Sequence, residues 1–376
     1  MKCKLKDFCT VINGRAYSQK ELLDKGKYRV LRVGNFFSSD RWYFSDLELP
    51  AEKYCNKGDL LFAWACSFGP RIWNGEDRTI FHYHIWKLDI DSDIIDKMYL
   101  FYLLKISVDS MTAGTHGSVM MHITKSDMEN FEFDIPSLDV QKKIAAILSA
   151  LDEKIATNRA INDNLQQQAF SVFDNLIANA ENNDYTVSDY AFLNPKRTLA
   201  KNQVARSIDM SQLSTSGAFP SGWEMKPFNG GMRFTNGDTL LARITPCLEN
   251  GKTAFIDFLD DGEVAFGSTE YIVLAPKNDT PPEMLYCLAR YPAFVDYAVK
   301  NMNGSSGRQR VSAETVGQYR LPLFDKHSLV LFKEVVSPMF LKMRYNSLEN
   351  MRLAELRDAL LPKLMSGEID VSAVQL

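Results

Sequence analysis

A glycine-bounded segment in the second half of the chain carries side chains suited to polar recognition. Residues 304–310 read Gly-Ser-Ser-Gly-Arg-Gln-Arg. Arginine can bind guanine through two hydrogen bonds, glutamine can bind adenine, and small residues let backbone amides approach a phosphate. The candidates for contacts with nucleic acid in this segment are Ser305, Ser306, Arg308, Gln309 and Arg310. A solvated surface turn is the alternative interpretation.

The first half of the chain contains a less basic counterpart of this segment. Residues 114–122 read Gly-Thr-His-Gly-Ser-Val-Met-Met-His, and they stand 190 positions before the second segment. Its candidate residues are Thr115, His116 and Ser118. Of the two segments, only the second is rich in arginine.

A second pair of candidate loops follows a Gly-Asp motif that occurs in each half of the chain. The candidates in these two loops are Arg71 and Trp73 in the first half, and Arg243, Thr245 and Lys252 in the second. For Trp64 and Trp73, burial in a hydrophobic core is as good an interpretation as stacking on a base.

The motifs of catalysis are missing from the sequence. It has no Gly-x-x-x-x-Gly-Lys-Ser/Thr phosphate loop and no Asn/Asp-Pro-Pro-aromatic methyltransferase motif, and 194–196 (Asn-Pro-Lys) does not replace the latter. His82 and His84 would share one face of an expected strand, but a third metal ligand is not evident. The six cysteines form no Cys-x-x-Cys pair, which favours reduced thiols. We therefore expect no catalytic, cofactor or metal site in this chain.

An internal repeat is the strongest pattern in the sequence. Lys57–Ala63 (Lys-Gly-Asp-Leu-Leu-Phe-Ala) corresponds to Asn236–Ala242 (Asn-Gly-Asp-Thr-Leu-Leu-Ala), 179 positions later. Leu5–Phe8 corresponds to Val187–Tyr190, 182 positions later. Offsets that drift while the order of motifs is kept are typical of two copies of one domain with different loop lengths.

Each copy ends in a long segment with the spacing of a coiled coil. From Leu138 to about Leu176, seam residues recur in steps of four and three, and the same series follows 188 positions later. Both series contain two asparagines on the seam, which are Asn158 and Asn162 in the first and Asn346 and Asn350 in the second. Asparagine at such positions fixes register, so we expect two helices, each spanning roughly 60 Å, that pack on each other.

Two prolines and the residues off the seam bear on the expectation of two packed helices. Pro338 would kink the second helix or delay its start, and Pro362 would end it near Leu361. The alternative is that each helix only covers its own domain. The polar faces at 152–154 and 166–168 favour helices that meet a partner.

The remaining sequence predicts two mixed α and β domains. Strands are expected at 79–88 and 270–274, helices at 97–104 and 282–288, and a hinge at 181–184. The boundaries that we predict are 1–137 for the first domain, 138–180 for the first helix, 181–324 for the second domain, and 325–376 for the second helix and tail.

Composition sets two further limits on function. With 43 Lys and Arg against 47 Asp and Glu, the net charge is −4, so DNA binding would need locally clustered bases or a more basic partner. The sequence has no apolar run long enough to span a membrane, and its first residues lack the apolar core of a secretory signal. These features predict a cytoplasmic location.

The order of motifs resembles that of type I restriction-modification specificity subunits. The resemblance is carried by 114–118, 123–128 and 135–144, which look like the junction between a target-recognition domain and a conserved helix, and by 356–369 at the end of the chain. It implies an α+β fold with two target-recognition domains separated by an antiparallel pair of long coiled-coil helices, related by a pseudo-two-fold internal repeat.

The resemblance also implies a function and a set of partners. Each domain would read one half of a bipartite, asymmetric site in double-stranded DNA, and the helices would fix the unread spacer. Two modification subunits would bind S-adenosylmethionine, and two restriction subunits would use ATP and Mg²⁺. This chain would itself be noncatalytic and bind none of these cofactors. The alternatives are the specificity subunit of a type IIB-like enzyme and, from another class, a coiled-coil scaffold that binds proteins.

Overall fold

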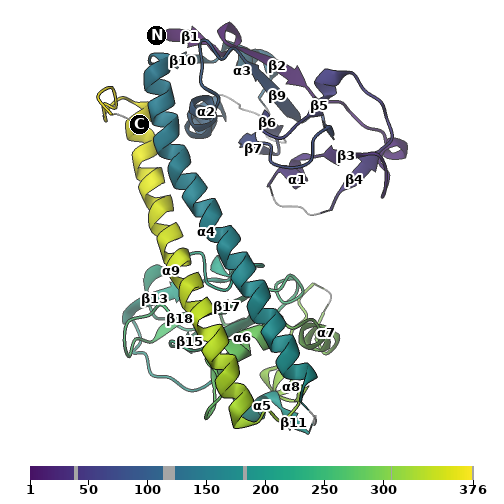
Figure 1. The fold of residues 1–376 in the computed structure, drawn as a ribbon, viewed down its shortest axis with the longest axis vertical. Helices are drawn as coiled ribbons and strands as arrows, with labels where there is room; N and C mark the ends of the chain where they lie inside the picture. Colours follow the sequence, from purple (N-terminus) through teal and green to yellow (C-terminus); the bar gives the residue numbers. More distant parts are fainter. Residues whose placement is uncertain (38–40, 113–122, 181–183, 306, 375–376) are drawn as a thin grey trace. The chain divides into compact units, whose positions relative to one another are not determined.

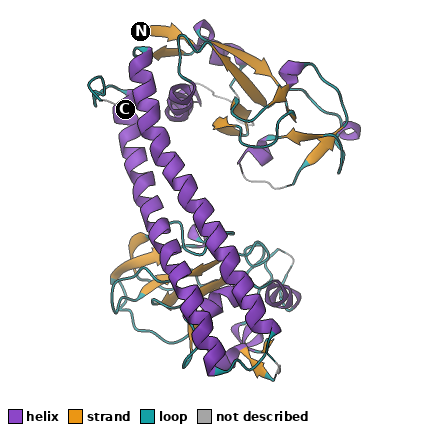
Figure 2. Cartoon of the chain, viewed as in Figure 1, coloured by secondary structure: helices purple, strands orange, loops and turns teal. Residues whose placement is uncertain are grey.

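The computed structural model describes residues 1–37, 41–112, 123–180, 184–305 and 307–374. The chain divides into two units, of which the first comprises residues 1–152 with 355–376 and the second residues 153–354. Each unit contains one globular domain together with parts of the two long helices (Figures 1 and 2).

Among its described residues, the domain of the first unit has ten strands. They are β1 (Lys2–Lys4), β2 (Cys9–Asn13), β3 (Tyr28–Leu31), β4 (Tyr43–Ser45), β5 (Tyr54–Cys55), β6 (Leu60–Ala65), β7 (Ser67–Ile72), β8 (Thr79–Phe81), β9 (Ile85–Ile90) and β10 (Glu132–Asp134). They form the sheets β1-β10, β2-β9-β6-β7 and β4-β3-β8-β5. The helices of this domain are α1 (Val33–Phe37), α2 (Lys97–Thr112) and α3 (Lys125–Asn130), with 3₁₀ turns at Leu5–Asp7, Gln19–Glu21 and Ala51–Lys53.

The domain of the second unit repeats this arrangement. Its strands are β11 (Tyr185–Thr186), β12 (Ala191–Leu193), β13 (Val204–Ile208), β14 (Glu224–Pro227), β15 (Met232–Phe234), β16 (Thr239–Ala242), β17 (Thr253–Phe255), β18 (Ala265–Gly267), β19 (Tyr271–Pro276) and β20 (Arg320–Leu321). They form the sheets β11-β20, β12-β19-β16-β17 and β14-β13-β18-β15. The helices are α5 (Val187–Tyr190), α6 (Pro282–Arg290), α7 (Pro292–Lys300) and α8 (Ala313–Gly317), with a 3₁₀ turn at Met210–Gln212.

The two domains therefore match strand for strand. Adding ten to each strand number of the first domain gives the strand order of every sheet in the second. The pairing directions agree as well, because β3 with β8 and β13 with β18 are parallel while the other named pairs are antiparallel. The predicted duplication and the predicted α+β fold class are confirmed.

The repeated Gly-Asp motif is a turn that starts a central strand. Gly58 and Gly237 have φ values of +92° and +86°, which favour glycine. In each copy, the aspartate that follows accepts a hydrogen bond from the backbone N–H three residues earlier: Asp59 from Asn56 at 2.9 Å, and Asp238 from Thr235 at 2.7 Å. The motif is thus explained by local structure.

The long helices are α4 (Leu138–Ala178) and α9 (Lys326–Met365). In the second unit, the amide of Asn346 donates to Asn162 at 2.8 Å, and the amide of Asn158 donates to Asn350 at 3.0 Å. Residue numbers rise along α4 as those of their partners fall along α9, so the helices are antiparallel. The predicted role of these four asparagines in fixing register is consistent with these direct contacts.

Each helix also packs on a domain, so the two interpretations of the helices are not exclusive. In the first unit, sheet β2-β9-β6-β7 and α2 pack on the first turns of α4 and the last turns of α9. In the second unit, sheet β12-β19-β16-β17 and α6 pack on later turns of α4 and earlier turns of α9. No helix among the described residues is long and apolar enough to cross a membrane.

The delayed start predicted from Pro338 and the end near Leu361 predicted from Pro362 were wrong. Helix α9 runs through Pro338 without a delayed start and through Pro362 to Met365. Both prolines are exposed, while Val336, Phe340, Leu361 and Leu364 on either side are buried. The carbonyl that each ring leaves without a partner therefore lies on the solvent side, and packing of the opposite face holds the helix together.

The predicted strand at 79–88 was also wrong in one respect. Strand β8 ends at Phe81 and β9 begins at Ile85, so His82 and His84 lie in a turn between two strands. They do not share the face of a strand, which removes the geometry behind a paired-histidine metal site. The hinge expected at 181–184 falls largely outside the described residues.

Candidate nucleic-acid interface

A set of three loops, which we call the loop frame, has the same backbone hydrogen bonds in both domains. The first part is the end of the central strand. In the first domain this is the end of β6, where the N–H of Trp64 donates to the carbonyl of His84 at 3.1 Å. In the second domain it is the end of β16, where the N–H of Arg243 donates to the carbonyl of Glu270 at 3.0 Å. These acceptors end the second part, the three-residue turn at 82–84 or 268–270.

The third part of the loop frame is the segment that follows each glycine loop. Ile123 donates its N–H to the carbonyl of Trp64 at 3.3 Å, and Val311 donates to that of Arg243 at 3.0 Å. The loop frame therefore joins the two kinds of candidate loop that the sequence indicated. Its backbone is common to both domains, while its side chains differ.

In the second domain, the loop frame holds an arginine-glutamate cluster. The Arg310 guanidinium donates from Nε to the Glu270 carboxylate at 2.9 and 3.0 Å, and from Nη2 at 2.7 Å. Arg243 Nε lies 3.5 Å from the same carboxylate. The hydrogen bonds from Arg310 hold the pKa of Glu270 below its usual value, and those same bonds raise the pKa of Arg310.

The two candidate loops of the second domain lie side by side. Thr245 donates its N–H to the carbonyl of Gln309 at 3.0 Å, and Ile244 forms a β-bridge with Arg310. The Thr245 hydroxyl lies 3.9 Å from the Met302 sulfur. Residues 243–245 and 309–311, which are far apart in the sequence, are thus joined by backbone contacts.

The remaining candidates of the second domain divide into two groups. Arg308 and Ser305 are exposed on the glycine loop, and Arg308 has no acidic partner among the described residues. The Lys252 ammonium is already engaged, because it donates to the carbonyl of Met210 at 2.7 Å. Ser306 lies outside the described residues.

The first domain carries aromatic and imidazole side chains at the loop frame. The rings of Trp64 and His84 meet edge to face with centroids 5.2 Å apart, and the Trp64 indole N–H donates to the carbonyl of Tyr83 at 2.7 Å. Burial lowers the pKa of His82 to about 4 and also lowers the pKa of His84. Both imidazoles are therefore neutral near pH 7, so each offers one donor and one acceptor.

The other candidates of the first domain are placed less favourably for binding. Trp73 is 5% exposed and its indole N–H donates to the carbonyl of Glu76 at 3.0 Å, which favours the core interpretation. Arg71 donates to the carbonyl of Phe36. Thr115, His116 and Ser118 lie outside the described residues.

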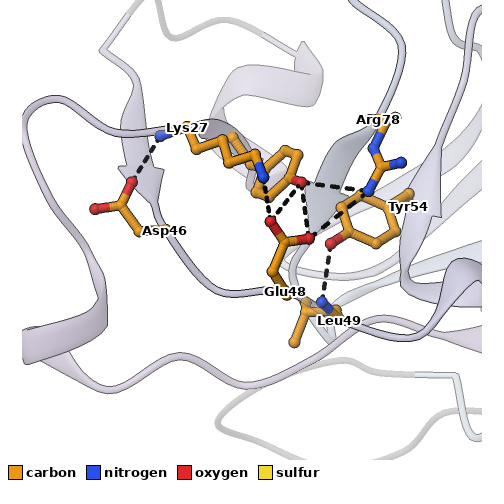
Figure 3. Close-up of polar contacts among 7 residues, drawn as sticks. Lys27, Asp46, Glu48, Leu49, Tyr54 and Arg78 are labelled. Atoms are coloured by element: carbon orange, nitrogen blue, oxygen red, sulfur yellow. Dashed lines mark hydrogen bonds and ion pairs between the residues drawn. The ribbon is translucent and has the colours of Figure 1, made fainter.

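Basic residues beside sheet β4-β3-β8-β5 of the first domain are already paired. Figure 3 shows Glu48 between Lys27 and Arg78, and its carboxylate also accepts a hydrogen bond from Tyr28 at 2.9 Å. In the second domain, Arg206 similarly binds Glu263 at 2.6 Å. Because a phosphate would have to compete with these carboxylates, such residues are weaker candidates for DNA contacts than Arg308.

Sequence reasoning missed Glu270, Tyr83 and His84 as members of the site. The offset of 179 between the Gly-Asp motifs also relates Trp64 to Arg243, but it does not relate His84 to Glu270, which come 186 positions apart. Glu270 itself had no signal, since it comes forty residues before the arginine that it binds.

Comparisons with known proteins agree with this architecture. A family model described as "Type I restriction modification DNA specificity domain" matches residues 1–167. The type I restriction enzyme HindI specificity subunit of Haemophilus influenzae is 23% identical over 86% of this chain and 89% of its own length. The type I restriction enzyme EcoAI specificity subunit of Escherichia coli is 33% identical over 34% of this chain and 22% of its own length.

A solved structure has the same fold. The S subunit of a type I restriction-modification system from M. genitalium aligns over 97% of this chain and 95% of its own, with a TM-score of 0.59 and 18% identity. The likeness therefore extends over both domains and both long helices.

Proposed function

We propose that the chain is a type I restriction-modification specificity subunit, as its similarity to members of that family supports, and that its two domains read the two halves of a bipartite, asymmetric DNA site. Under this proposal, α4 and α9 fix the length of the unread spacer. The chain supplies recognition and no catalysis.

The loop frame is the observation that carries the proposal. An asymmetric bipartite site requires two readers of the same construction with different chemistry. The loop frame has equivalent backbone hydrogen bonds in both domains, with Trp64 and His84 in one and Arg243 and Glu270 in the other. Side chains at equivalent places can thus select different bases without a change in the way that each domain is built.

The helix pair supports the proposed spacer. Asn158 and Asn346 are each 1% exposed, and each bonds to an asparagine of the other helix. A slip of one turn would bury these amides against apolar seam residues, which costs roughly 1–3 kcal/mol for each unsatisfied group. A helix pair that cannot slip is suited to keep the spacer at a fixed length.

The acidic charge of the chain bears on its proposed partners. A net charge of −4 gives little general attraction for DNA. We therefore propose that two modification subunits, each more basic than this chain, dock on it and supply further contacts with DNA. S-adenosylmethionine, ATP and Mg²⁺ would bind to the modification subunits and to two restriction subunits, in the cytoplasm. A type IIB-like enzyme, with methylation and cleavage fused in its partner, is the alternative assembly.

The methylome of cells that express this chain with its modification subunits tests the proposal. We expect methylation at a split motif, with two unlike half-sites and a fixed gap. Cells that express the modification subunits without this chain are the control, and they should lack the motif. A continuous motif, or a motif that persists in the control, would contradict the proposal.

A further inference from the structure

We propose that Arg310 reads a guanine in the half-site of the second domain, with Glu270 as the residue that positions it and Arg308 as a phosphate contact. The proposal rests on the DNA-reading function proposed above and assigns its chemistry to named residues.

The donors that remain on Arg310 fit a guanine. A guanidinium has five N–H donors. The Glu270 carboxylate accepts hydrogen bonds from the N–H of Nε and from one N–H of Nη2. The carbonyl of Arg308 accepts one from an N–H of Nη1 at 3.0 Å. One N–H therefore remains on each terminal nitrogen, and guanine offers two matching acceptors, O6 and N7, in the major groove. The Arg310 side chain is 36% exposed, so a base edge can reach it.

Charge separates the roles of the two arginines. The Glu270 carboxylate lies between 2.7 and 3.5 Å from Arg310 and Arg243, and it offsets one of their two positive charges, which makes this pair less attractive to a phosphate. A base edge carries no net charge, so recognition of guanine depends on a fixed orientation more than on charge. Arg308 is exposed without a described acidic partner and keeps its full charge, which suits a phosphate.

Glu270 also reduces the cost of ordering Arg310. An unrestrained arginine loses side-chain freedom when it binds, whereas Arg310 is held on two sides before DNA arrives. The first domain has Trp64 and His84 at the places of Arg243 and Glu270. The inference is therefore specific to one half-site, which gives its test an internal reference.

The test is a binding selection with the full chain in complex with its modification subunits, on duplexes randomised in both half-sites. For the unchanged protein we expect a required guanine at one position of the second half-site. Arg310→Lys should reduce the preference for that guanine by between about fivefold and about 150-fold, because lysine cannot make the paired contact. Preferences in the first half-site should stay as they are.

Two further variants separate reading from folding. Arg310→Gln should shift the preference at the same position from guanine toward adenine, a gain that a misfolded domain cannot produce. Glu270→Gln should weaken the guanine preference in the otherwise unchanged chain and add nothing in the Arg310→Lys background, which identifies a residue that acts through Arg310.

Arg308→Gln is the matched control from the same loop. It should weaken binding to all sequences alike and lower the slope of log affinity against log salt by about one, with base preferences kept. If Arg310→Gln behaves in this way, with no shift toward adenine, Arg310 contacts a phosphate and the inference is overturned, while the split motif and the proposed function stand. If the unchanged complex selects no split motif, the proposed function itself fails.

Discussion

Replacing Asp238 by asparagine should change how the stability of the second unit depends on pH. The Asp238 side chain is 1% exposed, and it accepts hydrogen bonds from Arg197 at 2.8 Å and from the Thr235 N–H at 2.7 Å. Burial is the largest influence and raises the pKa of Asp238 to about 6, although both hydrogen bonds act in the opposite direction.

The sign and size of the effect follow from linkage. Because the pKa in the folded state lies above the unfolded value of 3.8, the folded state binds this proton more tightly. The stabilisation is complete below about pH 3.8 and is lost as the pH rises through about 6, a total of about 3 kcal/mol. Asparagine does not titrate, so the free energy of unfolding of Asp238→Asn should lack this loss.

The assay is urea denaturation of both proteins between pH 4.5 and 7, followed by thiol labelling of Cys287. This cysteine is 1% exposed in the core of the second unit, so its labelling reports unfolding there. The unfolding free energy of the unchanged protein, minus that of the variant, should fall as the pH rises. Asp59→Asn, at the equivalent turn of the first unit, is the control.

The opposite trend would refute the reasoning. If the difference grows with pH, the ion pair with Arg197 outweighs burial and the pKa of Asp238 lies below its usual value. A difference that does not vary with pH would mean that the carboxyl is hydrated in solution.

Three further predictions concern the two domains and the helix pair. Gly267→Ala should weaken only the second half-site in the binding selection, because its Cβ would lie 2.3 Å from the carbonyl of Ile208 and displace the turn at 268–270; an altered first half-site would contradict this. Trp73→Ala should destabilise the first unit by about 3–5 kcal/mol in urea denaturation, since Trp73 is buried, and a loss under 1 kcal/mol would place it on the surface. Seven residues inserted after both Asn158 and Asn346 should lengthen the methylated spacer by about three base pairs, at about 1.5 Å per residue and about 3.4 Å per base pair. An unchanged spacer would show that the helices do not measure it.

The repeat and the helix seam could be predicted because both appear in the sequence as residues at regular spacings. The seam asparagines recur at a fixed offset of 188, and the Gly-Asp turns mark the same strand in each domain. The predicted delayed start at Pro338 and the predicted end at Pro362 were wrong because they relied on the low helix propensity of proline. The packing of the buried face of α9 overrides that propensity. The exposed positions of the two prolines, with buried neighbours on the opposite face, are a property of the folded helix.

The candidate site was predicted only in part, for a similar reason. The segments rich in arginine and glycine were visible in the sequence, but the partner that orients Arg310 was not. Glu270 and Arg310 are joined by the pairing of the loops at 244 and 310, which is a tertiary contact. The break at His82–His84 was hidden because apolar residues continue to alternate with polar ones from β8 into β9.

The antiparallel asparagine contacts constrain how such a chain can evolve. Asn158 meets Asn350 and Asn162 meets Asn346, so each residue contacts the copy of its neighbour. One residue inserted in a single helix would rotate everything beyond it by about 100° and take the following asparagine off the seam. Under the proposed function, a new spacer length therefore needs matched changes in two distant parts of the gene. A new base preference needs one substitution in one loop, so half-sites should diversify faster than spacers.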